Sequence, residues 1–125
     1  QGVGEENMLK CFHFDCCSFE EATKRWKITP QTIEISDSCK YMTIFNEKHT
    51  NCFGLNELNL NGEFFMKSNG SFFVAVIYSG DVSITCGGKN YSFSQGDELF
   101  FPAAIKTITW KTTKPAKVLL CYPPV

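Results

Sequence analysis

Arginine is nearly absent from the chain: Arg25 is the single copy among 125 residues, and the formal net charge is −1. Proteins that bind nucleic acid or an anionic membrane surface carry a field of lysine and arginine side chains. The chain also has no apolar run near the roughly 20 residues that a transmembrane helix needs. We therefore expect neither a nucleic-acid partner nor a membrane partner.

Histidine is scarce as well, with His13 and His49 as the two copies. The sequence has no G-x-S-x-G elbow and no Ser-His-Asp order, so nucleophilic hydrolysis is not indicated. His13 lies in the lead-in and His49 in a polar turn, and we expect both to be plain surface residues.

The seven cysteines are an odd number without the regular spacing of a disulfide framework. We expect reduced, mostly buried thiols and a cytoplasmic location. One cluster, Cys11-x-His13-x2-Cys16-Cys17, invites a zinc interpretation. Its spacing differs from the two ligand pairs separated by a loop that zinc knuckles use, so we favour an ordinary segment there.

Phenylalanine is abundant, with 12 copies, and many of them lie in short segments that alternate apolar and polar residues. Such alternation is typical of strands, whose side chains point to opposite faces in turn. Segment 72–78 is apolar at every position and predicts an internal strand that is covered on both faces. Turn residues separate these segments, and together they predict about nine short strands in an all-β sandwich or barrel.

The first 30 residues have a different pattern. Residues 18–21, Ser-Phe-Glu-Glu, form a capping box that begins a short helix over 19–26, and Pro30 follows its end. We expect a lead-in with this one helix over residues 1–30 and a β-barrel domain over residues 31–125. The first seven residues lack the basic start and apolar stretch of a signal peptide. Because the chain starts at Gln1, we expect a processed chain or a piece of a longer protein.

Residues 91–103, Tyr-Ser-Phe-Ser-Gln-Gly-Asp-Glu-Leu-Phe-Phe-Pro-Ala, resemble the second conserved stretch of cupins, G-x5-P-x-G-x2-H-x3-N. Gly96 and Pro102 match that spacing: the glycine makes a tight turn into a strand, and the proline ends the strand. The resemblance implies a cupin-like jelly-roll β-barrel or sandwich. The order of the lead helix, the strands, this stretch and the closing Cys-Tyr-Pro-Pro also resembles the C-terminal part of class I mannose-6-phosphate isomerases.

That family implies an aldose–ketose isomerisation, mannose 6-phosphate to fructose 6-phosphate, in carbohydrate metabolism. It also implies zinc, held in a separate N-terminal catalytic cupin. We expect this chain to be an accessory domain without cofactor that packs on such a domain or on a homodimer partner and is inactive alone. The alternatives are a stand-alone cupin that binds a sugar or sugar phosphate without catalysis, and a remnant enzyme with activity of its own.

The metal-ligand positions of cupins carry other residues in this chain. When the first cupin stretch is aligned on Gly80, its ligand positions fall on Lys67, Asn69 and Phe73, or with one more spacer residue on Met66, Ser68 and Phe73. In the second stretch, the remaining glycine, histidine and asparagine positions fall on Ala104, Thr107 and Lys111. These residue types do not suit a transition metal, so we expect no catalytic, cofactor-binding or metal-binding residues here.

A ligand inside the barrel would meet side chains that point inward from the strands. Aromatic faces stack on sugar rings, and polar tips bind their hydroxyls. On this basis the expected lining residues are Lys67, Tyr78, Thr107 and Trp110.

Overall fold

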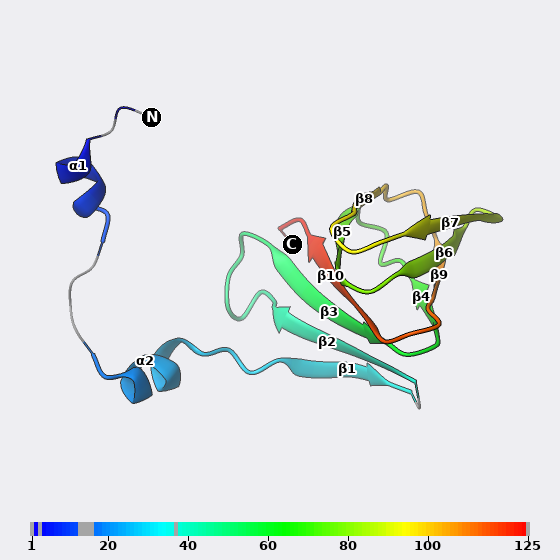
Figure 1. The fold of residues 1–125 in the computed structure, drawn as a ribbon, viewed down its shortest axis with the longest axis horizontal. Coiled ribbons are helices and arrows are strands. Elements are labelled where there is room, and N and C mark those ends of the chain that lie inside the picture. The colour runs from blue at the N-terminus through cyan, green and yellow to red at the C-terminus, as the bar shows by residue number, and fades with distance from the viewer. Residues whose placement is uncertain (1, 3, 13–16, 37, 125) are drawn as a thin grey trace.

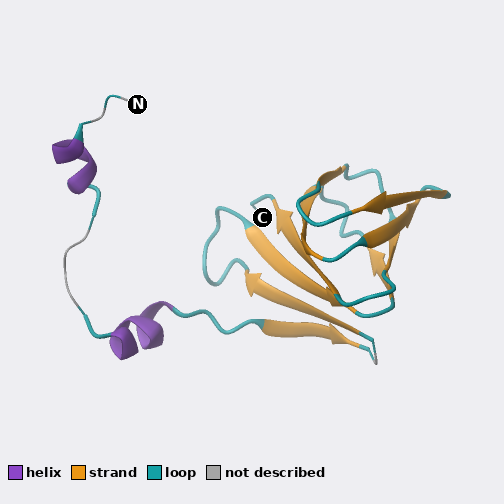
Figure 2. Cartoon of the chain, viewed as in Figure 1, coloured by secondary structure: helices purple, strands orange, loops and turns teal. Residues whose placement is uncertain are grey.

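The computed structural model describes residues 2, 4–12, 17–36 and 38–124. In these residues two short helices precede ten strands. Figure 2 colours the helices purple and the strands orange. In chain order the elements are α1 (Glu5–Leu9), α2 (Phe19–Trp26), β1 (Gln31–Ile35), β2 (Cys39–Phe45), β3 (Gly54–Leu60), β4 (Glu63–Lys67), β5 (Phe73–Ser79), β6 (Val82–Cys86), β7 (Lys89–Phe93), β8 (Glu98–Phe101), β9 (Thr107–Lys111) and β10 (Ala116–Tyr122).

The strands form two antiparallel sheets that face each other (Figure 1). The larger sheet has the strand order β1-β2-β3-β10-β5-β8, and the smaller has the order β4-β9-β6-β7. The expected all-β class is therefore confirmed. The described residues form ten strands, whereas the sequence predicted about nine.

The core lies between the sheets and is built from alternate residues of the strands. Phe73, Ala75 and Ile77 of β5 are buried, whereas Val74 and Val76 between them are half-buried on the other face. Phe73 stacks on Phe101 with ring centroids 4.6 Å apart. Such a core of interleaved aromatic and branched side chains holds the two sheets in register.

The helix over 19–26 forms where the sequence predicts it. Ser18 Oγ accepts a hydrogen bond from the backbone N–H of Glu21, and the carboxylate of Glu21 accepts one from the backbone N–H of Ser18. The sequence did not predict α1. Neither helix has a buried residue, and both stand apart from the strands in Figure 1. No helix in the described part of the chain is long and apolar enough to cross a membrane.

The turns carry the expected glycines. Gly80 connects β5 to β6 with φ of 79°, and a Cβ there would lie 2.9 Å from both the Ala116 Cβ and the Pro115 carbonyl oxygen. The pairing of β2 with β3 shifts between Thr43 and Phe45, opposite Asn56 and Leu55, so the irregularity lies in β2, and β3 pairs with β10 without a shift.

The thiols are only partly as expected. Six of the seven cysteines lie in the described residues, and all six are free. The expectation that most are buried is wrong, because Cys11, Cys17 and Cys52 lie in exposed parts of the chain. The cluster from Cys11 to Cys17 includes His13 and Cys16, which lie outside the described residues.

Candidate functional site

A cavity of about 460 Å³ lies at the mouth of the barrel. It lies at the ends of β2, β3, β4 and β10, beside the loop that connects β2 to β3. Its volume falls in the range of small-molecule sites. Phe45 and Phe53 give it an apolar wall. Its polar lining residues are Tyr41, Asn56, Lys67 and Tyr122, together with Thr43, Asn46, Glu47, Thr50, Asn51 and Asn69.

Three polar side chains from three neighbouring strands form one hydrogen-bonded group in this cavity. The Tyr41 and Tyr122 hydroxyl oxygens lie 3.2 Å apart, and Asn56 Nδ2 donates to the Tyr41 hydroxyl at 2.6 Å. They meet because β3 lies between β2 and β10 in the larger sheet. Their side chains point to the core face of this sheet, at the end where the core opens.

The two tyrosines are fixed by the core rings behind them. The Tyr41 ring lies 5.8 Å from that of Phe64, and the Tyr122 ring lies 5.2 Å from that of Phe73. Burial, and then the neighbouring Tyr41, raises the pKa of Tyr122 well above its ordinary value. Tyr122 is therefore a neutral hydrogen-bonding group at physiological pH.

The apolar wall belongs to the loop between β2 and β3. The rings of Phe45 and Phe53 lie 5.5 Å apart at its two ends. Inside the loop, Asn46 Oδ1 accepts from the backbone N–H of Lys48 and lies 2.9 Å from His49 Nδ1. His49 is exposed and part of this turn, as the sequence predicted, so its ring serves the loop conformation.

The four expected lining residues do not gather in one place. Lys67 lines the cavity at its rim, but it is exposed and pairs with Thr107 on the outward face of β4, so it does not point inward from the strand. Trp110 points inward, but it is 0% exposed in the core, and its Nε1 has no hydrogen-bond partner among the described residues. Tyr78 and Thr107 do not point inward: Tyr78 is 58% exposed on the outer face of β5, and Thr107 alternates with buried Ile108 at the start of β9.

Sequence reasoning missed Tyr41, Asn56 and Tyr122. The alternation of Tyr41, Thr43 and Phe45 places these three residues on one face of a strand, and that signal was available. What the sequence did not provide was the pairing of β3 with β10, which brings the end of the chain beside residues 54–60.

The residues at the cavity do not fit a zinc ion. Zinc in proteins is held by cysteine, histidine and carboxylate ligands. Here Lys67, two tyrosines, four asparagines and two threonines line the space, and Glu47 at the loop is the carboxylate among the lining residues. No three histidine, cysteine or acidic side chains gather anywhere in the described parts of the chain.

A second feature is the outer face of the larger sheet, by which we mean the outward side chains of β3, β10, β5 and β8. Cross-strand partners lie on one face, so Val76 pairs with Leu119, and Val74 pairs with both Cys121 and Phe100. Cys121 in turn pairs with Leu55. The apolar members of the outer face are Leu55, Val74, Val76, Tyr78, Phe100, Leu119 and Cys121.

Solved structures of other proteins share the fold at low sequence identity. The EutQ protein of Clostridium difficile superposes with a TM-score of 0.61 at 18% identity, over 75% of this chain and 76% of that one. Ectoine synthase from P. lautus superposes with a TM-score of 0.62 at 13% identity, over 87% of this chain and 77% of that one. KdgF from Halomonas sp. superposes with a TM-score of 0.61 at 12% identity, over 76% of this chain and 88% of that one. These likenesses support the cupin-type jelly-roll fold.

The sequence itself matches one family. No curated protein matches the chain. The family model of the mannose-6-phosphate isomerase cupin domain matches residues 41–114, which is more than half of the chain. The matched region runs from β2 to the loop after β9 and includes Tyr41, Asn56 and Lys67. The chain therefore belongs to the family of mannose-6-phosphate isomerase cupin domains.

Proposed function

We propose that this chain is an accessory, non-catalytic cupin domain that docks through its outer face on the zinc-bearing catalytic domain of a mannose-6-phosphate isomerase-like protein. The catalytic domain would interconvert mannose 6-phosphate and fructose 6-phosphate and is supplied either by the same polypeptide or by a separate subunit. The observation that carries this proposal is the apolar outer face of β5 and β10.

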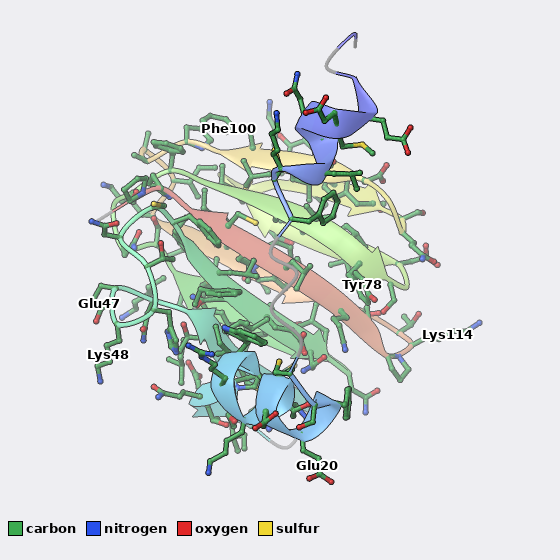
Figure 3. All side chains as sticks on the ribbon, turned by 90° about the vertical axis from the view of Figure 1, so that its left-hand side faces the viewer. Glu20, Glu47, Lys48, Tyr78, Phe100 and Lys114 are labelled. Carbon is green, nitrogen blue, oxygen red and sulfur yellow. The ribbon has the colours of Figure 1, made fainter. Side chains whose placement is uncertain are left out.

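An antiparallel sheet with one face in water normally alternates apolar and polar residues. β5 departs from this pattern, because the outward positions Val74, Val76 and Tyr78 are as apolar as the inward ones. Phe100 on the adjacent strand β8 is 65% exposed, and its ring lies 5.8 Å from that of Phe72. Figure 3 looks onto this side of the sheet and shows Tyr78 and Phe100 on it. Contiguous exposed apolar surface of this kind marks an interaction site.

The apolar residues of the outer face have charged neighbours, as in protein interfaces with a buried centre and a polar rim. Lys117 Nζ lies 3.6 Å from a carboxylate oxygen of Glu57 and 5.8 Å from the centre of the Tyr78 ring. The opposite charges of Lys117 and Glu57 compensate each other beside Val76 and Leu119. A partner can therefore cover this part of the outer face without burying an isolated lysine. Glu98, the exposed cross-strand partner of Val76 on β8, would lie at the rim of the interface.

We assign this face to the catalytic domain because the matching family describes one cupin domain of an isomerase. A second copy of this chain is the competing occupant, and the experiment below separates the two. The cavity residues supply no metal-ligand set, so no step of the isomerisation is assigned to this chain. We place the protein in the cytoplasm, where the six free thiols of its described part would stay reduced.

The test mixes the chain with a separately produced zinc-bearing mannose-6-phosphate isomerase catalytic domain, encoded in the same reading frame or elsewhere in the same genome. Co-elution is measured by size-exclusion chromatography with light scattering. We expect a 1:1 complex that the substitution Val76→Lys abolishes, because it places a charge at the centre of the outer face. Thr85→Lys, on the outward side of β6 in the other sheet, is the control and leaves the complex intact.

Isomerase turnover is measured on the same fractions. We expect the chain alone to give none. Turnover by the chain alone contradicts the non-catalytic assignment. A homodimer of this chain that Val76→Lys dissociates, with no complex formed, contradicts the assigned partner.

A further inference from the structure

We infer that the barrel-mouth cavity binds a small organic anion, whose oxygens are held by a phenolic hydroxyl of the Tyr41–Tyr122 pair and by the Lys67 ammonium. The expected ligand is a carboxylate or a phosphate monoester that carries an apolar group. This inference rests on the cavity alone and stands whether or not the outer face binds a catalytic domain.

The two phenols bring one more proton than the described side chains can accept. Each phenol carries one O–H, which donates once, while its oxygen accepts. The Tyr41 oxygen already accepts from Asn56 Nδ2, and its contact with the Tyr122 oxygen uses one of the two phenolic protons. The other proton has no acceptor among the described residues, whichever tyrosine donates. A half-buried donor without a partner favours an occupant that brings an acceptor oxygen.

The cavity also has a positively charged lining residue. Lys67 lines the same cavity, and in the described chain it forms no ion pair. A hydrogen bond to an anionic oxygen is about twice as strong as one between neutral groups, so the phenol and the ammonium together favour an anion over a neutral hydroxyl. Glu47 is the acidic lining residue, and its exposed side chain lies beside Lys48 on the loop, at the edge of the molecule in Figure 3.

The loop wall of Phe45 and Phe53 lines the same cavity as the polar group. A flat or cyclic apolar body can lie on these rings while its anionic group reaches the tyrosine pair. With about 460 Å³ of space, the cavity suits a ligand the size of a substituted ring.

The probes are therefore benzoate and phenyl phosphate, which separate carboxylate from phosphate, with benzyl alcohol and methyl mannoside as neutral comparisons. Affinity is measured by isothermal titration calorimetry and by ligand-induced shifts in two-dimensional NMR spectra. We expect at least one anion to bind saturably, with shifts at residues 41, 56, 67 and 122, and the neutral compounds to bind about tenfold more weakly or not at all.

Two variants and two matched controls localise the site. Lys67→Gln and Tyr122→Phe should each weaken anion binding about tenfold, and Lys67→Gln should also remove most of its dependence on ionic strength. Lys89→Gln and Tyr91→Phe, on the exposed edge strand β7, should leave the affinity unchanged. Circular dichroism checks that the variants fold, and Lys67→Gln, at an exposed position, provides the test if Tyr122→Phe does not fold.

Three outcomes overturn the inference. One is the absence of saturable binding by either anion. Another is binding of methyl mannoside or benzyl alcohol as strong as that of the anions. The third is anion binding that the two controls weaken as much as Lys67→Gln does.

Discussion

The hydroxyl oxygens of Tyr41 and Tyr122 lie 3.2 Å apart although the two residues are 81 positions apart in the chain. The contact joins β2 to the last strand across β3 and depends on the β3–β10 pairing. The strand order of the larger sheet therefore brings the polar side chains of the cavity together.

Tyr122 should make the protein sensitive to alkali. Its pKa is raised in the folded chain because burial and the neighbouring Tyr41 disfavour the phenolate, whereas the unfolded chain ionises near the ordinary value of 10.0. Above pH 10 the unfolded state therefore binds fewer protons, and the free energy of unfolding falls as the pH rises. Urea denaturation between pH 8 and about 11 should show this fall, and Tyr122→Phe should reduce its slope. An equal slope in the variant contradicts the assignment.

Gly80 should tolerate alanine less well than Gly96. Both have positive φ, 79° and 94°, but a Cβ at Gly80 meets Ala116 and the Pro115 carbonyl at 2.9 Å, whereas nothing lies within 4 Å at Gly96. Gly96→Ala therefore costs only backbone strain, about 1 kcal/mol. Gly80→Ala adds overpacking and should cost at least about 1 kcal/mol more. Equal midpoints of urea denaturation for the two variants would count against the close approach of this turn to β10.

Trp110 anchors the core between the sheets. It is fully buried, and its ring lies 5.6 Å from that of Phe101. Trp110→Ala should lower the free energy of unfolding by about 3–5 kcal/mol, because a large cavity remains. Trp110→Phe should cost clearly less, since it keeps most of the apolar contact and removes the unpaired Nε1 donor. Chemical denaturation measures both, and a phenylalanine variant as unstable as the alanine variant would contradict this interpretation.

Ser18→Ala should destabilise the helix α2 without lowering the global stability of the protein. It removes the acceptor for the Glu21 backbone N–H and one half of the capping box. Loss of such a cap costs about 1 kcal/mol of helix stability. Because α2 buries no residue, we expect faster amide exchange over residues 19–26 with no change in the global unfolding midpoint. A lower midpoint would show that α2 packs on the sheets.

Much of the fold follows from local patterns. The helix over 19–26 and the turn at Gly96 were both predicted, because each depends on residues close together in sequence. α1 was missed because its start, Glu5-Glu6, follows a glycine that provides no side-chain cap.

The site was harder to predict because side-chain direction depends on the phase of each strand. Segment 72–78 is apolar throughout, so its alternation cannot tell which residues face inward, and Tyr78 was assigned to the wrong face. Thr107 and Trp110 are three positions apart in one strand, so they lie on opposite faces. The partners of Tyr122 depend on strand order, which only the structure provides.

A natural thiol on the outer face reports directly on whether a catalytic domain covers that face. Cys121 lies between Leu55 and Val74 in the sheet, whereas Cys52 is exposed in the loop before β3. The measurement is the rate of alkylation of each thiol by iodoacetamide, followed by mass spectrometry, with and without the zinc-bearing domain. We predict that the domain slows alkylation of Cys121 about tenfold or more and leaves Cys52 unchanged. Complex formation with an unchanged rate of Cys121 alkylation would contradict docking through the outer face.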